Sequence, residues 1–125
     1  MTTTFRIVYN TSMKLIDKPI LKQELKKMDV ILSGGLAKAV VDIKKEIIVI
    51  DAAMHADEER YLLDLGSSQD DLWGINLYPN ITGDDFIEFD SMINLRPRLN
   101  NFSRGIDDEK IRNKITTIVN KLIIK

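Results

Sequence analysis

Apolar and polar residues alternate along this chain with two periods, one typical of helices and the other of strands. Over residues 17–28 the side chains of Leu21, Leu25 and Met28 recur at spacings of four and three, which predicts an N-terminal helix. Asp17 stands where it could accept hydrogen bonds from the first turn. We therefore expect a helix close to the start of the chain.

The helical period is strongest at the other end of the chain, over residues 107–123. Asp107 is placed to cap this segment, and Asp108 and Glu109 suit the positive end of a helix dipole. One face of the expected helix carries six apolar residues: Ile111, Ile115, Ile118, Val119, Leu122 and Ile123. We predict an amphipathic C-terminal helix that covers one face of a sheet.

The strand signals lie between these two helices and before the first. Residues 4–10 and 72–79 predict single strands, and residues 37–52 predict a hairpin that turns at 42–46. Residues 86–97 alternate most regularly of all and predict a further strand. Together these elements predict an α+β fold: a mainly antiparallel sheet of four to five strands, packed by the N-terminal helix and the C-terminal amphipathic helix.

One segment fits two structures. Residues 53–65 are rich in helix-forming residues and are followed by Gly66, a natural helix end, yet they also alternate like a strand; we favour the helix. The chain shows neither an internal repeat nor a Pro/Gly-rich linker, so we expect a single domain over residues 1–125. Residues 1–16 are a candidate peripheral extension of that domain.

Composition narrows the class of protein. With 44% hydrophobic and 30% charged residues the chain is typical of a globular domain. It has no cysteine, which excludes disulfides, thiolate metal sites and cysteine nucleophiles. The first residues do not resemble a signal peptide, and no apolar run reaches the roughly 20 residues that span a bilayer. We therefore expect a cytoplasmic protein without membrane contact.

The net charge of −1 conceals a strong segregation of charge. Residues 1–50 have a net charge of +4 and residues 91–125 of +5, whereas residues 51–90 carry 11 acidic side chains and one basic one. We favour mutual neutralisation across the folded surface. The alternative is a basic patch that meets an anion or a nucleic acid.

The only histidine, His55, lies among acids in the stretch DAAMHADEER. A transition-metal site usually needs a second imidazole or a thiolate, so we expect no metal and no cofactor here. We favour a hydrogen-bonded or solvated histidine near a helix start. A role as a ligand or general base and a pH-sensitive structural contact are the alternatives.

Two further groups of polar residues are candidates. Glu88, Asp90, Asn94 and Arg96 would share one face of the strand expected over 86–97, roughly 7 Å apart. Asn76, on the preceding strand, could join them. This row is either the ordinary wet face of a sheet or a site for a polar molecule or a hard cation.

The second group is the loop that follows this strand. Arg98 and Arg104 join Arg96 there, with Phe102 available for stacking. Guanidinium groups bind phosphates and carboxylates well. We favour pairing of these arginines with the acidic middle segment, and contact with an anion or nucleic acid is the alternative.

Four strings occur together and in order: HADEE (55–59), DLWGINLYP (71–79), FIEFDSMINLRP (86–97) and SRG (103–105). Over about residues 37–123 the chain resembles a family of short bacterial and archaeal proteins known only as a domain of unknown function. The resemblance implies one intact prokaryotic domain. It brings no activity, substrate or site residue.

Three functions follow from these observations as hypotheses. The leading one is a non-enzymatic binding module for a protein or a small polar or anionic ligand, expected as a homodimer. The second is a small hydrolase or nuclease-like enzyme that uses His55 as base, Glu88 and Asp90 as carboxylates, and Arg96 or Arg104 against a phosphate. The third is nucleic-acid binding through the basic flanks, as in a toxin–antitoxin or regulatory protein.

Overall fold

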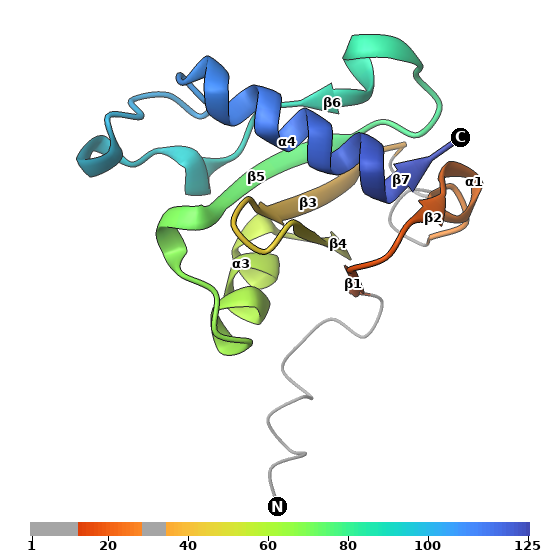
Figure 1. The fold of residues 1–125 in the computed structure, drawn as a ribbon, viewed down its shortest axis with the longest axis horizontal. Coiled ribbons are helices and arrows are strands. Elements are labelled where there is room, and N and C mark those ends of the chain that lie inside the picture. Colours follow the sequence, from red (N-terminus) through yellow and green to blue (C-terminus); the bar gives the residue numbers. More distant parts are fainter. Residues whose placement is uncertain (1–12, 29–34) are drawn as a thin grey trace, which may run out of the picture.

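A five-stranded antiparallel sheet is the centre of the fold (Figure 1). The computed structural model describes residues 13–28 and 35–125. Across the sheet the strands follow the order β1 (Lys14–Ile16), β4 (Ile47–Ala52), β3 (Ala37–Asp42), β5 (Leu72–Leu77) and β6 (Ile87–Glu88). The predicted α+β class, the antiparallel sheet and the hairpin are confirmed, since β3 and β4 pair across a short turn. The strand predicted over residues 4–10 lies outside the described residues.

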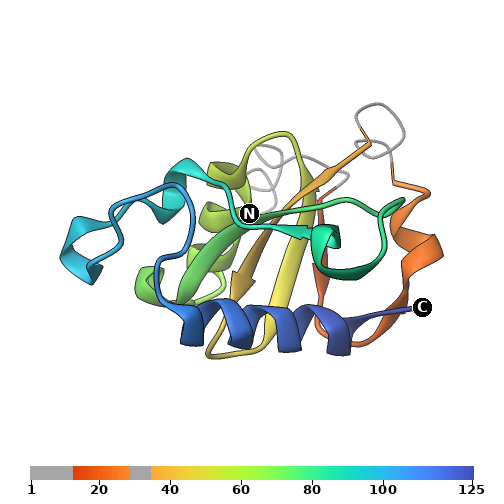
Figure 2. The same cartoon turned by 90° about the horizontal axis from the view of Figure 1, so that it is seen from above.

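Two helices cover the opposite faces of this sheet (Figures 1 and 2). Helix α4 (Glu109–Leu122) buries its apolar stripe against the larger core, which contains alternate residues of β3, β4 and β5. Helix α3 (His55–Asp64) covers the other face, where Leu62 packs with Val40, Val49 and Leu72. The favoured helical interpretation of residues 53–65 is confirmed, as is the amphipathic C-terminal helix.

The N-terminal helix is much shorter than the sequence predicted. Only α1 (Lys22–Leu25) is helical, and β2 (Ile20–Leu21) precedes it. This strand pairs in parallel with β7 (Ile123–Ile124) at the C-terminal end of the chain. The pattern over residues 17–28 could not reveal this pairing because the partner lies a hundred residues away, and tertiary contacts override local propensity.

Local sequence explains where α4 begins and where α3 ends. Asp108 caps α4 by accepting a hydrogen bond from the backbone N–H of Lys110 at 2.8 Å. Asp107, which was expected to be the cap, instead accepts from Phe102 N and Ser103 Oγ. Helix α3 ends at Asp64, and Gly66 follows its cap Leu65 with a φ of +98°, which is accessible mainly to glycine.

The strand predicted over residues 86–97 is wrong. Within this segment only Ile87–Glu88 joins the sheet, and 3₁₀ turns follow at Met92–Asn94 and Pro97–Leu99. The expected faces also fail, because Asn94 is fully buried while Leu95 is 45% exposed. The cause lies on β5: Gly74 has no side chain, so the segment folds inward and Ser91 occupies the space.

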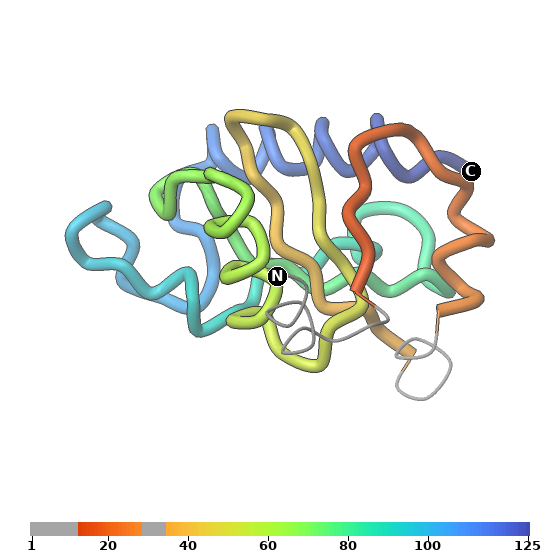
Figure 3. Tube along the Cα trace, turned by 90° about the horizontal axis from the view of Figure 1, so that it is seen from below, coloured from red at the N-terminus to blue at the C-terminus, as the bar shows by residue number. Residues whose placement is uncertain are grey.

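The candidate peripheral extension contributes to the sheet. Residues 14–16 form the edge strand β1, whose three residues pair with β4 in register from Lys14 opposite Ile50 to Ile16 opposite Ile48. Figure 3 shows β1, β4 and β3 running side by side.

Candidate functional site

A β-bulge at the end of β4 sets the position of the first turn of α3. The register between β3 and β4 shifts at Lys38 and Ala39, which leaves Asp51 as an extra residue with a φ of +72°. Directly after it, the backbone N–H of Ala52 donates to Oε2 of Glu58 at 3.1 Å. The side chain of Glu58 therefore ties α3 to the bulge.

Glu58 is fully buried, which is rare for a carboxyl group. Loss of solvation raises its pKa well above 4.5, and the nearby charges of Asp51 and Asp57 act in the same direction. The hydrogen bond from Ala52 and the positive charge of Lys38 oppose this shift. Its second oxygen, Oε1, has no partner among the described residues. The environment thus favours the neutral, protonated acid.

His55 lies one helical turn before Glu58 and is also buried. Its Nε2 lies 2.7 Å from the carbonyl oxygen of Ile75. Because a carbonyl only accepts, Nε2 must carry the proton, and in the neutral ring Nδ1 is then an acceptor. Burial lowers the pKa of His55, assisted by the charges of Lys38 and Arg104 and opposed by Ile75 and Asp90. A neutral imidazole is therefore favoured.

Lys38 and Asn76 complete this group from the sheet. They face each other across β3 and β5 and so project on the same side. The amide nitrogen of Asn76 donates to Glu88 Oε1 at 2.8 Å and to the carbonyl of Asp90 at 3.3 Å. Its buried Oδ1 has no partner within the described part of the chain. We call His55, Glu58, Lys38 and Asn76 the α3 site.

Residues 89–108, which we call the arm, connect β6 to α4 and project beyond the sheet (Figure 2). Asn94 anchors the arm by using all its hydrogen-bonding groups. Its Oδ1 accepts from Gly74 N at 2.8 Å, and its Nδ2 donates to the carbonyls of Gly74 and Arg104. Asn101 similarly donates to the carbonyls of Asn94, Ser103 and Gly105. These amides therefore organise the backbone.

The three arginines of the arm each pair with an acid from residues 51–90, as the favoured interpretation expected. Arg104 pairs with Asp90 at 2.7 Å and Arg98 pairs with Asp70, both at exposed positions. Arg96 is buried and pairs with Glu59 at 3.2 Å. It also lies over the ring of Trp73, 5.1 Å from the centroid.

Helix α3 and the arm therefore meet, although more than thirty residues separate them along the chain. His55 lies close enough to Asp90 and Arg104 for their charges to affect it. The row proposed on one strand face is divided. Asn76 donates to Glu88 and to the carbonyl of Asp90, and the charge of Asp90 acts on His55. The other members lie apart from it: Arg96 pairs with Glu59, Arg98 pairs with Asp70, and the side chain of Asn94 bonds the backbone of Gly74.

Two members of the α3 site were missed from sequence. Glu58 was noted only as one of several acids, and Lys38 was not singled out. A usable signal existed for each. Glu58 follows His55 by three residues, which places both on one helical face. Lys38 is the only charged residue among the first five residues of β3, and the other four are apolar.

Two other kinds of feature are absent from residues 13–28 and 35–125. There, histidine and carboxylate side chains nowhere gather in threes with a geometry that would hold a metal ion. Nor does this part of the chain contain a helix with the length and apolarity needed to cross a bilayer.

Comparison with known families covers most of the chain. A family model described as "Protein of unknown function (DUF5674)" matches residues 14–122, so the chain belongs to this family. The match begins earlier than the resemblance noted from sequence and takes in β1 and α1. Searches of curated proteins and of solved structures returned no match.

Proposed function

We propose that this member of the DUF5674 family is a binding module that holds a small polar ligand at the α3 site. The support comes from buried side-chain atoms that lack hydrogen-bond partners. In the described part of the chain there are four: Glu58 Oε1, Asn76 Oδ1, Trp73 Nε1 and Arg96 Nη1. The first two belong to the α3 site and support the proposal, whereas Trp73 lies in the core on the α4 face and Arg96 lies in the arm. Such atoms are rare because each costs about 1–3 kcal/mol.

The chemistry of the α3 site defines the ligand class. The ammonium group of Lys38 and the protonated carboxyl of Glu58 are donors, while Oδ1 of Asn76 and Nδ1 of His55 are acceptors. A ligand that satisfies all four needs both acceptors and donors on a small frame, as in a hydroxy acid, an amide or a nucleoside base. Lys38 is only half-buried and connects the site to solvent.

A ligand screen tests this proposal. The full-length protein, labelled with ¹⁵N, is screened against a panel of polar metabolites, with chemical shifts read at residues 52–58 and 74–76. Lys38→Met removes the ammonium group and keeps most of the side-chain stem. We expect it to weaken binding by about tenfold or more, as loss of a charged hydrogen bond predicts.

Lys44→Met is the matched control, because Lys44 lies at the exposed turn of the same β3–β4 hairpin. It should bind the ligand as the wild type does. If no member of the panel shifts these residues, or if both lysine variants bind equally well, the proposal is wrong.

Acid–base catalysis at the same site is the second candidate. The observation in its favour is that burial shifts the pKa of Glu58 upward and that of His55 downward, on adjacent turns of α3. A neutral acid beside a neutral base is the arrangement that general acid–base chemistry needs. Turnover of a panel of esters and phosphate esters, lost in Glu58→Gln, would support it; a rate indifferent to that variant would exclude it.

We also propose that the protein is cytoplasmic and prokaryotic and that it forms a homodimer. The absence of cysteine supports the cytoplasmic location. The edge strand β1 supports the dimer, because β4 is its only strand neighbour among the described residues. Light scattering after size exclusion tests the dimer. Nucleic-acid binding is less well supported, since Arg96, Arg98 and Arg104 already pair with carboxylates.

A further inference from the structure

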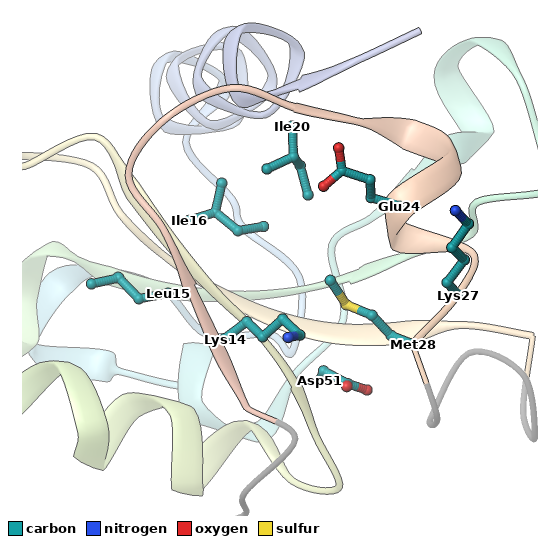
Figure 4. A pocket seen from close by; sticks show the side chains of 8 residues that line it. All are labelled: Lys14, Leu15, Ile16, Ile20, Glu24, Lys27, Met28 and Asp51. Atoms are coloured by element: carbon teal, nitrogen blue, oxygen red, sulfur yellow. The ribbon is translucent and has the colours of Figure 1, made fainter.

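A cavity of about 480 Å³ lies on the side of the sheet that carries β1, away from the arm. Its walls come from β1, from the segment that includes β2 and α1, and from the bulge of β4 (Figure 4). Pockets that bind small molecules range from roughly 300 to 1,000 Å³. The cavity is therefore large enough for a ligand of modest size.

The cavity has an apolar part and a charged part. Ile16, Ile20 and Met28 supply most of its apolar lining. Four charged side chains also line it, two of each sign: Lys14, Lys27, Glu24 and Asp51. In Figure 4 Lys14 reaches in from β1 and Met28 from the opposite side, with Glu24 above and Asp51 below.

Asp51 is the most unusual residue of this lining. It is almost completely buried and adopts a positive φ of +72°, which is uncommon for a residue with a side chain. The bulge of β4 thus holds a carboxylate at the base of the cavity in a backbone conformation that glycine would adopt more easily. Strained residues of this kind concentrate at ligand sites.

We propose that this cavity binds an amino acid with an aliphatic side chain. The ligand ammonium group would face the carboxylate of Asp51, and its carboxylate would face the ammonium group of Lys14. Glu24 and Lys27 line the opposite side and balance the charge of the cavity. The aliphatic side chain would lie against Ile16, Ile20 and Met28. Because two positive and two negative groups line the cavity, a zwitterion matches it better than a ligand of either net charge.

The test is titration of the full-length protein with leucine, followed by isothermal calorimetry and by ¹⁵N chemical shifts. The des-amino analogue 4-methylpentanoic acid and the decarboxylated analogue isoamylamine are titrated in parallel. We expect leucine to shift the signals of residues 14–16, 20–28 and 51. Each analogue should bind about tenfold or more weakly, since each lacks one charged group.

Variants locate the binding. Asp51→Asn removes the charge and keeps a residue type that tolerates positive φ, and Glu24→Gln changes an exposed residue of α1 and so keeps the test valid if the first variant folds poorly. Both should weaken leucine binding. Lys110→Gln, an exposed change on α4 that lines no part of the cavity, should not.

Three results would overturn the proposal: no leucine binding at roughly 10 mM, an analogue that binds as tightly as leucine, or shifts confined to the α3 site. Lys38→Met separates this proposal from the proposed function. Lys38 does not line the cavity, so leucine binding should survive in this variant even if the α3 site has no ligand.

Discussion

Replacement of Glu58 by glutamine tests the most consequential feature of the α3 site. Glutamine keeps the shape of the protonated acid and an oxygen that can accept from Ala52 N, but it does not titrate. In the wild type the raised pKa means that the native state holds a proton which the unfolded state releases near pH 4.5. The stability contributed by Glu58 is therefore complete below pH 4.5 and is lost as pH rises through the native pKa.

The size of this pH dependence is set by the binding of a single proton. A single group that binds a proton in the native state only changes the free energy of unfolding by at most about 1.4 kcal/mol per pH unit. The difference in unfolding free energy between Glu58→Gln and wild type should thus rise with pH at up to that slope, starting near pH 4.5. Any constant offset from the new amide does not affect the slope.

Urea denaturation measured at intervals from about pH 4 to pH 8 gives this difference. Trp73 is the only tryptophan and reports unfolding by its fluorescence. His55 titrates in both proteins, so its contribution to the free energy of unfolding cancels in the difference between them. Asn113→Gln, an exposed amide change on α4, should run parallel to wild type at every pH. If Glu58→Gln also runs parallel, Glu58 is ionised in the native state and the reasoning about this site is wrong.

Three further outcomes are expected. Gly74→Ala should destabilise by about 1–3 kcal/mol in urea unfolding, because its Cβ would lie 2.5 Å from that of Ser91; Ser91→Gly should recover part of the loss, and Gly105→Ala, with no contact under 3.4 Å, should cost less. Asn94→Asp should destabilise by about 2–5 kcal/mol, since two buried carbonyls would face a carboxylate oxygen. Nitrogen NMR of His55 should show the Nε2–H form and a titration midpoint below pH 6.5. The stability that this group contributes is complete above pH 6.5 and is lost as pH falls through the native pKa. A midpoint above pH 6.5 would contradict the burial of this ring.

The hairpin and the two long helices were predictable because their signals are local. The runs over residues 37–52 are apolar on both faces, and both faces are indeed covered, one by α3 and one by α4. The six apolar positions of the last helix identified it with little ambiguity. Where local pattern and tertiary contact agree, sequence is sufficient.

The errors over residues 17–28 and 86–97 share a physical cause: contacts made by groups distant in sequence. Residues 20–21 became a strand because the end of α4 continues into β7 beside them. The regular alternation after residue 86 was broken because Asn94 supplies hydrogen bonds that a neighbouring strand would otherwise supply to Gly74. Neither partner can be identified from a period in the local sequence.

The candidate site was partly foreseeable. His55 stood out because it is the only histidine, and Asp90 does lie near enough for its charge to act on the ring. Glu58 could not be distinguished from its neighbours, since its burial depends on a bulge that places Ala52 N above it. Bulges leave almost no mark in a sequence when the residue with positive φ is not glycine.

The amide of Asn94 has a consequence for how this protein behaves in a crowded solution. Strand β6 covers only the end of β5, at Asn76 and Leu77, so the outer edge at Gly74 would otherwise present a free N–H and a free carbonyl. Such an edge is a template for strand exchange and aggregation. Because one side chain occupies both groups, this part of β5 is closed to strand addition, and the outer strands β1 and β6 remain as the edges of the sheet.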